Sequence, residues 1–413
     1  MGKEIKVKID ELKRNRRAFL RSGVTGLAAA ALAPSVIVKA EEVKAEPKKE
    51  VKKYPIIKRT LGRTGIKIPV ISMGANSEDK ALYTAALDAG LTHIDTGNSY
   101  LRGRHEELVA EVIKGRPRDS LVMCTKVYVR YDQKTGLFPA GTTGEIFLKP
   151  FEESMKRLGV KHLDILYLHD AARAGAATYG PILETMQKIK KDGKTRFLGL
   201  SVHTNEPEVI RAAADCKVYD VILTSYNFKQ PHVAEVKDAI AYAAKAGLGI
   251  VAMKTQAGVF LDKEQTKPIN HRAAIKWVLS DTNVHTTIPG FENFEQMELF
   301  LSVMGDLTLT PQEKADLDSA KVQAGLYCAQ CGECLPQCPK GVLVPTYMRA
   351  FMYAYGYRKP GKAKETIAET MPAELPCSYC SSCKVSCVMG FDVKGRLMDV
   401  ARVRNVPEEF LIA

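Results

Sequence analysis

Residues 328–339 read CAQCGECLPQCP, and residues 377–388 read CSYCSSCKVSCV. In each stretch four cysteines are separated by gaps of two, two and three residues: Cys328, Cys331, Cys334, Cys338 and Cys377, Cys380, Cys383, Cys387. Three thiolates from one tight loop plus a fourth from farther along are what a cubane of four irons and four sulfides requires. The eight cysteines therefore predict two 4Fe–4S clusters.

Two other uses of these cysteines are open. Disulfides would suit a protein exported to an oxidising compartment. Zinc sites usually pair two Cys-x-x-Cys hooks rather than placing three cysteines in series. Cys124 and Cys216 lie far from both stretches, and we expect them to be ordinary buried thiols.

Residues 325–395 resemble the bacterial two-cluster ferredoxins. Val388 stands where that family has a second proline, and the loop between the two motifs is long. The resemblance implies that the fourth cysteine of each motif crosses over to the other cluster. One cluster would then take Cys328, Cys331, Cys334 and Cys387, and the other Cys377, Cys380, Cys383 and Cys338.

Upstream of the cysteines, short apolar runs alternate with helical patterns. The expected strands are Val70–Ser72, Thr92–Asp95, Leu121–Lys126, Asp164–Leu168, Phe197–Ser201, Val221–Thr224, Gly249–Met253 and Thr286–Pro289. Eight strand–helix units predict an α/β fold of the (β/α)8 TIM-barrel type, followed by a ferredoxin-like iron–sulfur domain. We expect a signal segment at 1–40, a linker at 41–53, the barrel at 54–323, and the two-cluster domain with a C-terminal tail at 324–413. Residues 56–68 predict a hairpin that caps the barrel bottom.

Polar residues follow the C-terminal ends of several predicted strands, where the active sites of such barrels lie. The stretches are His93-Ile94-Asp95-Thr96 with Tyr100 after it, Cys124-Thr125-Lys126-Val127, His169-Asp170 and Thr287-Ile288-Pro289-Gly290. Over about residues 56–303 this pattern resembles the aldo-keto reductases. The resemblance implies an oxidoreductase in which Tyr100 is the proton donor, Asp95 and Lys126 form a charged pair, and His169 orients the substrate.

These residue types suit carbonyl reduction, which adds a hydride to carbon and a proton to oxygen. A free tyrosine has a pKa near 10 and is a slow acid or base at neutral pH. We expect the ammonium of Lys126 to lower the pKa of Tyr100, and Asp95 to keep Lys126 charged. The alternatives are a structural role for His169 and a helix-capping role for Asp95.

The resemblance also implies a nicotinamide cofactor. Ser201, Gly290 and Gln296 are the residues available to contact it. Other positions depart from the family pattern: Val202, Leu223, Met253 with Lys254 beside it, Glu292 and Phe300. Glu292 would repel the 2′-phosphate of NADP, so NAD is easier to fit.

Residues 15–21 read NRRAFLR, and an apolar run from Gly23 to Val38 precedes Lys39-Ala40. A basic head, a short apolar core and a small residue at the end form an export signal. The pair Arg16-Arg17 followed by a Phe-Leu resembles a twin-arginine signal, which implies export of the folded protein to the periplasm or the outer face of the inner membrane. The alternative is a short amphipathic helix. No run of about 20 apolar residues exists, so we expect no transmembrane span beyond this segment.

The net charge of +13 does not indicate nucleic-acid binding. Residues 1–40 carry nine Lys/Arg and three Asp/Glu, and bound clusters would offset more of the surplus. No basic stripe interleaved with aromatic residues occurs. The expected partners are a small carbonyl or alcohol substrate and a redox partner protein.

Three functions are compatible with these patterns. The first is an oxidoreductase that works on a carbonyl or alcohol at Tyr100 and uses the clusters as an electron relay. The second is an electron-transfer protein whose barrel is a catalytically silent docking module. The third is an enzyme whose clusters are purely structural. The intact Asp/Tyr/Lys/His set favours the first, and the altered nicotinamide contacts favour the second.

Overall fold

The computed structural model describes residues 54–411, apart from residues 76, 324 and 369–374. The predicted signal segment and linker, including Arg16 and Arg17, lie outside the described residues.

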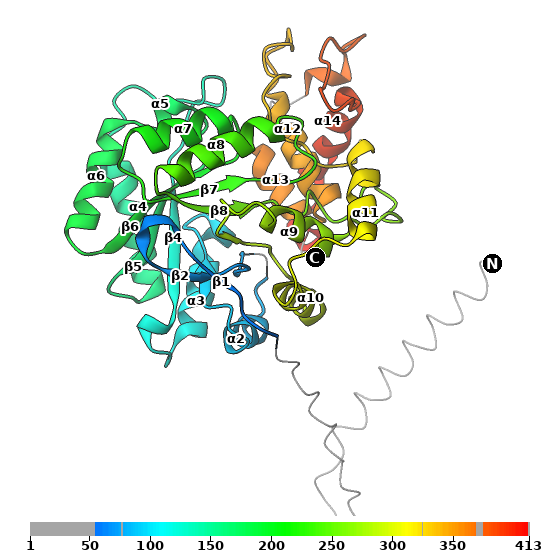
Figure 1. The fold of residues 1–413 in the computed structure, drawn as a ribbon. Helices are drawn as coiled ribbons and strands as arrows, with labels where there is room; N and C mark the ends of the chain where they lie inside the picture. Colours follow the sequence, from blue (N-terminus) through cyan, green and yellow to red (C-terminus); the bar gives the residue numbers. More distant parts are fainter. Residues whose placement is uncertain (1–53, 76, 324, 369–374, 412–413) are drawn as a thin grey trace, which may run out of the picture. The chain divides into compact units, whose positions relative to one another are not determined.

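A seven-stranded parallel sheet forms the centre of the first part of the described chain (Figure 1). Its strands follow one another in chain order: β3 (His93–Asp95), β4 (Val122–Tyr128), β5 (Leu163–His169), β6 (Thr195–Val202), β7 (Val221–Ser225), β8 (Gly249–Met253) and β9 (Thr286–Thr287). Because all pairs are parallel, the C-terminal ends of the strands meet at one end of the sheet. The predicted catalytic residues lie at that end.

Helices connect the strands and cover the outer face of the sheet. They are α2 (Lys80–Asp88), α3 (Arg104–Ile113), α4 (Glu145–Leu158), α5 (Ala174–Ala177), α6 (Gly180–Lys191), α7 (Glu206–Asp215), α8 (Val233–Lys245), α9 (His271–Leu279), α10 (Phe294–Met304) and α11 (Pro311–Val322). In α4 the buried residues Phe147, Phe151 and Leu158 recur at helical spacing, and Gly159 ends the helix at φ 64°. Fully burying a side chain of this size contributes about 1.5–3 kcal/mol.

The first predicted strand, Val70–Ser72, differs from the prediction, because it makes single bridges rather than a ladder. Ile71 bridges to Thr287 of β9, and Met73 bridges to Ile94 of β3, both in parallel. The run is cut short at Gly74, where an added Cβ would lie 2.6 Å from the carbonyl oxygen of Ile288. The segment therefore joins the two edge strands of the sheet, with backbone hydrogen bonds to both, such as Ser72 N–H to the carbonyl oxygen of Thr287 at 2.8 Å and Met73 N–H to that of His93 at 3.0 Å.

The predicted hairpin at the barrel bottom is present. β1 (Lys58–Thr60) pairs antiparallel with β2 (Lys67–Pro69). Leu61 between them is completely buried in the cluster that fills the sheet interior, together with Tyr167, Val251 and Met253. Leu61, which packs against Gly249 at the start of β8, closes the end opposite the predicted site.

The region between the two cysteine motifs is helical, not the long loop expected from the sequence. α12 (Val344–Phe351) runs directly into a π-helix, Met352–Gly356, and α13 (Pro360–Ala368) follows. After the second motif comes α14 (Val393–Ala401). The apolar faces of α12 and α14 pack together in a separate core that also contacts five of the motif cysteines. In the part of the chain that is described, no helix is both long and apolar enough to cross a membrane.

The segment after α12 lies against two loops of the sheet region. The backbone N–H of Val259 donates to the carbonyl oxygen of Gly356 at 3.0 Å. Lys359 forms an ion pair of 2.5 Å with Glu292 in the loop after β9. Both loops follow C-terminal strand ends, so the cluster domain adjoins the predicted catalytic end.

Candidate functional site

Asp95 and Lys126 form the floor of the site. Lys126 on β4 is 1% exposed, and its Nζ donates to Asp95 Oδ2 at 2.5 Å and to the carbonyl oxygen of Thr96 at 2.8 Å. Asp95 ends β3, the neighbouring strand. The same Nζ lies 4.6 Å from the centroid of the Tyr100 ring. Burial alone would lower the pKa of Lys126, but Asp95 and Tyr100 outweigh it and raise that pKa, so Lys126 stays charged.

Tyr100 differs from the prediction in its acidity. Burial is the largest influence and raises the pKa of Tyr100, while the charge of Lys126 and a hydrogen bond to it lower the pKa less. Asp95 adds to the increase, because its carboxylate repels a phenolate. The net direction is upward, not downward. Tyr100 therefore holds its proton at neutral pH, as the proton donor in a reduction must.

His169 ends β5 and completes the predicted set. Its ring centroid lies 5.6 Å from that of Tyr100, with the rings at 81°. Burial, followed by the nearby cations, holds the pKa of His169 well below its usual range, so the imidazole is neutral. Its Nδ1 is buried and has no hydrogen-bond partner in the described part of the chain. The structure thus brings Asp95, Tyr100, Lys126 and His169 together at one end of the sheet.

A second group of polar residues surrounds this site, and two of them, Arg349 and Tyr353, come from the cluster domain. Lys254 follows β8, and its Nζ lies 3.4 Å from the hydroxyl of Tyr353 in the π-helix. Arg349 of α12 lies 3.8 Å from Asp170, which follows His169. His203 lies next to His169, with 6.0 Å between ring centroids. We call Lys254, Arg349 and Tyr353 the cationic rim.

Two residues at this end of the sheet, Lys254 of the cationic rim and Asp170 beside it, have strained backbone. Asp170 has φ 60° and Lys254 has φ 54°. Residues other than glycine rarely adopt this left-handed region, and doing so costs of order 1–3 kcal/mol. Both residues directly follow barrel strands and both contact the cluster domain, so the surrounding packing holds them in these conformations.

Sequence reasoning did not identify Arg349, Tyr353 or the role of Lys254. Lys254 was visible as a departure from the family pattern beside Met253. Arg349 and Tyr353 lie between the cysteine motifs, and their sequence context carries no catalytic motif. Only the packing of α12 and the π-helix against the strand ends brings them to the site.

Two of the predicted nicotinamide contacts, Ser201 and Gln296, make hydrogen bonds within the protein. Ser201 is completely buried, and its Oγ accepts a hydrogen bond from the backbone N–H of Asp170 at 2.8 Å. Gln296 Oε1 accepts from the backbone N–H of Glu292 at 2.9 Å, in the loop that also contains Gly290. Phe300 is buried in the core, and Lys359 of the cluster domain pairs with Glu292. One oxygen of Ser201 and one of Gln296 thus already accept hydrogen bonds from the backbone of neighbouring segments.

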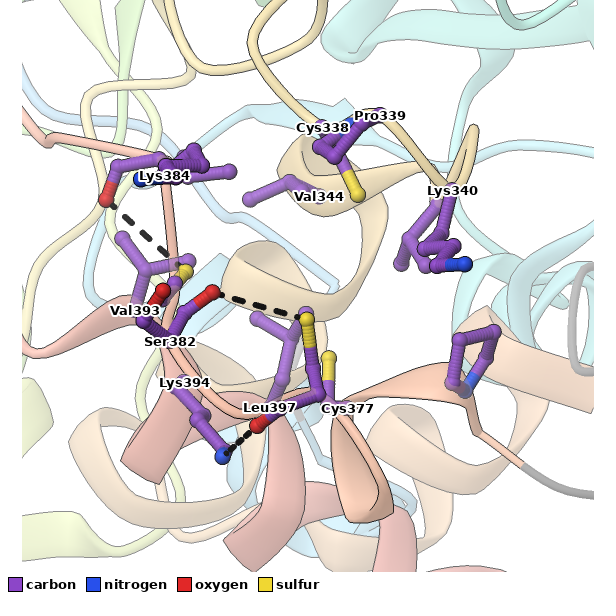
Figure 2. Close-up of a pocket in the computed structure, with 15 residues that line it drawn as sticks. Cys338, Pro339, Lys340, Val344, Cys377, Ser382, Lys384, Val393, Lys394 and Leu397 are labelled. Carbon is purple, nitrogen blue, oxygen red and sulfur yellow. Dashed lines mark hydrogen bonds between the residues drawn. The ribbon is translucent and has the colours of Figure 1, made fainter.

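The eight motif cysteines line two pockets, four in each. Cys338 of the first motif shares a pocket with Cys377, Cys380 and Cys383 of the second, and in Figure 2 the sulfur atoms of Cys338 and Cys377 point into it. The other pocket is lined by Cys328, Cys331, Cys334 and, from the second motif, Cys387. These are the two crossed sets implied by the ferredoxin resemblance.

The remaining lining of these pockets is mostly apolar, which fits a cluster held away from water. Val342, Val393 and Leu397 line the first, and Met348 and Phe391 line the second. Burial raises the pKa of Cys328 and of Cys334 to about 12, so these thiols need the positive charge of iron to ionise. Within the described ranges, no three Cys, His, Asp or Glu side chains form a site for a single metal ion.

The two other cysteines lie outside these pockets. Cys124 is buried inside the sheet, where its sulfur lies 3.0 Å from Nε2 of His93. Cys216 is half-buried and donates to the carbonyl oxygen of Ala213 at 3.2 Å.

Comparison with known proteins separates the chain into the same two parts. Residues 73–273 match the model of the Aldo/keto reductase family, and residues 327–392 match that of a 4Fe-4S dicluster domain. L-glyceraldehyde 3-phosphate reductase of Escherichia coli K12 is 23% identical over 322 residues, 63% of this chain and 91% of the relative. L-galactose dehydrogenase of Arabidopsis thaliana is 28% identical over 234 residues, 52% of this chain and 70% of the relative.

Solved structures support the fold. The holo form of aldo-keto reductase AKR11C1 from Bacillus halodurans gives a TM-score of 0.53 at 18% identity, covering 64% of this chain and 96% of its own. The thermostable aldo-keto reductase Tm1743 gives 0.52 at 22% identity, covering 64% and 100%. The part of the chain that contains the floor residues therefore has the aldo-keto reductase type of fold.

Proposed function

We propose that this chain, an oxidoreductase with an aldo/keto reductase domain at residues 73–273 and a 4Fe-4S dicluster domain at 327–392, interconverts a carbonyl compound and its alcohol at Tyr100 and exchanges the electrons through iron–sulfur clusters. The observation that carries the proposal is the position of Lys126. It lies between Asp95 and Tyr100, and the cluster domain adjoins the same site through Tyr353.

The protein groups supply positioning and a proton. Tyr100 donates its hydroxyl proton to the substrate oxygen during reduction and takes it back during oxidation. Lys126, kept charged by Asp95, stabilises the phenolate that remains. His169 is neutral, so its N–H can orient the substrate oxygen without adding charge.

The stoichiometry of carbonyl reduction sets the number of electrons that the clusters must supply. One carbonyl, two electrons and two protons give one alcohol. Tyr100 supplies the proton that oxygen takes and solvent the proton that carbon takes, and two 4Fe–4S clusters, each exchanging one electron when bound, would match one turnover. The pocket of Cys328 adjoins the segment that carries Tyr353. Cys328 and Tyr353 both contact one apolar cluster, which includes Ala257 and Met352.

The test uses the full chain prepared without oxygen. We expect about eight irons per chain, and we expect dithionite-reduced clusters to be reoxidised when a carbonyl substrate is added without nicotinamide cofactor. Glyceraldehyde 3-phosphate is a reasonable first probe, because a similar protein is named for reducing it. Clusters that stay reduced across a broad panel of carbonyl compounds, or turnover that requires NADPH, would contradict the relay.

The ligand sets can be tested separately. Cys338→Ser should remove the cluster whose other ligands are Cys377, Cys380 and Cys383, and leave about four irons and one paramagnetic resonance signal. Cys216→Ser is the matched control, because Cys216 lines neither pocket. Loss of both clusters, or of neither, would contradict the crossed ligation.

The second candidate function is electron transfer with a catalytically silent barrel. It is favoured by the internal hydrogen bonds of Gln296 and Ser201, which occupy the predicted cofactor contacts. Under this function, Tyr100→Phe would leave cluster reoxidation by any partner unchanged. Under the leading proposal, the same change stops reoxidation by the carbonyl substrate.

For localisation, we propose export of the folded protein through the twin-arginine route, on the strength of Arg16-Arg17 and the apolar run after them. Replacing both arginines by lysine keeps the charge and removes the recognised pair. Cell fractionation should then find the double variant in the cytoplasm. Export at the normal rate would show that this segment is not such a signal.

A further inference from the structure

Lys254 is a positive charge without a carboxylate partner among the described residues. Its Nζ lies 3.4 Å from the hydroxyl of Tyr353 and 5.2 Å and 5.8 Å from the ring centroids of Tyr353 and Tyr357. By contrast, Lys126 on the floor is neutralised by Asp95. The rim therefore carries a positive charge that no ion pair in this part of the chain balances.

Arg349 is only weakly paired. Its nearest carboxylate oxygen, on Asp170, lies 3.8 Å away, and that oxygen also accepts a hydrogen bond from the hydroxyl of Tyr131 at 3.2 Å. Arg349 Nε is buried and has no hydrogen-bond partner among the residues that the structure describes. Leaving a buried charged donor unsatisfied is costly, so a ligand that accepts from it would be bound favourably.

Arg349 lies 3.8 Å from Asp170, which directly follows His169, so the rim charges lie next to the catalytic groups. Lys254 and Arg349 both depress the pKa of His169 and of His203, after the larger effect of burial. The charge of Tyr353 influences Tyr100 in turn. An anionic group held at the rim would therefore leave the rest of a small molecule within reach of Tyr100 and His169.

Several features hold the rim residues in place. Lys254 has a left-handed backbone, and its carbonyl oxygen accepts from Asn227 Nδ2 at 3.1 Å. Tyr353 lies in the π-helix, a rare form that occurs often at functional sites. The end of that helix is fixed by the bond from Val259 N–H to Gly356. Backbone of this kind is kept where a specific side-chain placement is needed.

We propose that Lys254, Arg349 and the hydroxyl of Tyr353 form an anion subsite, shared between the two domains, that selects small carbonyl or alcohol substrates carrying a phosphate or carboxylate group. This inference rests on the proposed function for the identity of the reacting group. It assigns the cluster domain a second role, because Arg349 and Tyr353 complete the substrate site from outside the barrel.

Binding is measured first, without turnover. Calorimetry on the holoprotein, with inorganic phosphate and with oxalate as probes, should detect one site per chain. Lys254→Met should weaken binding by about 10–100-fold, the range expected for losing a hydrogen bond to a charged group. Lys245→Met is the matched control, because Lys245 is exposed at the end of α8, before β8, and lies at the opposite end of the sheet. Equal binding by both variants would overturn the subsite.

Arg349→Lys and Arg349→Met provide an independent test. The lysine variant keeps the charge and should bind the probes within about 10-fold of the original protein, whereas the methionine variant should lose more. Far-ultraviolet circular dichroism and the cluster absorbance report whether each variant is folded. If Arg349→Met does not fold, the anion affinities of Lys254→Met and Arg349→Lys still test the subsite.

Kinetics then identify the ligand source and separate the two proposals. Glyceraldehyde 3-phosphate is compared with glyceraldehyde, and pyruvate with acetone, in the presence of reduced clusters. Lys254→Met should lower kcat/KM about 10–100-fold for whichever anionic member is the better substrate, and change the neutral member less than about 3-fold. The pair with the larger discrimination distinguishes phosphate from carboxylate.

Failure of the anion subsite and failure of the proposed function give different experimental results. Anion binding that depends on Lys254, with no turnover of any carbonyl compound, would leave the subsite standing and contradict the proposed function. Turnover with equal preference for neutral and anionic substrates would contradict the subsite alone. Competition between phosphate and NADH for the same site would assign the rim to a dinucleotide and overturn the substrate assignment.

Discussion

The floor and the rim of the site each contain a tyrosine beside a lysine, and the two pairs behave differently. Lys126 lies 4.6 Å from the ring centroid of Tyr100, and Lys254 lies 5.2 Å from that of Tyr353. In both, burial raises the tyrosine pKa. For Tyr100 that effect wins, but for Tyr353 the charges of Lys254, Arg349 and Lys362 outweigh it and lower the pKa.

The difference lies in the neighbouring carboxylate. Asp95 neutralises Lys126 and also repels a phenolate on Tyr100, so the floor is balanced and keeps a proton on its tyrosine. Lys254 has no such partner in the described chain, so the rim keeps its positive charge. Under the two proposals above, the same two residue types serve proton donation in one place and anion attraction in the other.

The largest expected difference between floor and rim comes from removing the tyrosine hydroxyl, that of Tyr100 in one variant and that of Tyr353 in another. Tyr100→Phe should lower the turnover rate by about 10²–10⁴-fold, because no proton can pass to or from the substrate oxygen. Tyr353→Phe should lower kcat/KM for an anionic substrate less than about 10-fold and leave kcat nearly unchanged. Steady-state kinetics without oxygen measure both. Equal losses in the two variants would remove the distinction between floor and rim.

The carboxylates should differ in their contribution to stability. Asp95→Asn leaves Lys126 charged and buried, which should cost about 3–5 kcal/mol. Asp170→Asn should cost about 1 kcal/mol, because Arg349 is 20% exposed and 3.8 Å away. Urea unfolding, followed by circular dichroism with clusters intact, gives both values. A milder loss for Asp95→Asn would mean that the buried pair is replaced by another contact.

The pH profile of alcohol oxidation should respond to the floor lysine alone. Lys126 opposes the increase in the Tyr100 pKa, so Lys126→Met should raise that pKa further. Tyr100 must be deprotonated to accept a proton, and the rise of the rate with pH should therefore move to higher pH. Lys254→Met should leave this rise where it is. Movement to lower pH in Lys126→Met would contradict the arrangement of charges.

Among these predictions, the effect of salt should be the smallest. Salt should change the KM for an anionic substrate, which depends on the rim, and not kcat. Raising ionic strength from about 0.05 to 0.5 M should increase KM for an anionic substrate a few-fold, since the Debye length shortens and the half-buried rim is screened. The floor pair is excluded from solvent, so kcat should be nearly constant. The neutral member of the substrate pair is the control.

Much of this molecule could be predicted from sequence where the information is local. The gaps between the cysteines predict two four-cysteine sites, and the two pockets contain the crossed sets that the ferredoxin resemblance implies. Seven of the predicted strands form the parallel sheet, because apolar runs and turn residues mark them along the chain. The clustering of Asp95, Tyr100, Lys126 and His169 followed from their places at strand ends.

What could not be predicted depends on packing between distant segments. The direction of the Tyr100 pKa shift is set by how deeply the ring is buried, which no short stretch encodes. Arg349 and Tyr353 reach the site only because α12 and the π-helix pack against loops more than 50 residues earlier in the chain. The bridging form of Val70–Ser72 depends on the close approach of Gly74 to Ile288.

The place of the rim residues along the chain has a consequence for maturation. Arg349 and Tyr353 lie between Cys338 and Cys377, which line the same pocket, so a cluster bound there would tie both ends of the segment that carries them. Metal binding and folding are coupled in small cysteine-rich domains. We expect the barrel to acquire its complete substrate site only after iron loading, so that newly made protein is inactive until it is assembled. Anion binding by apoprotein, measured before and after reconstitution with iron and sulfide, should follow cluster content.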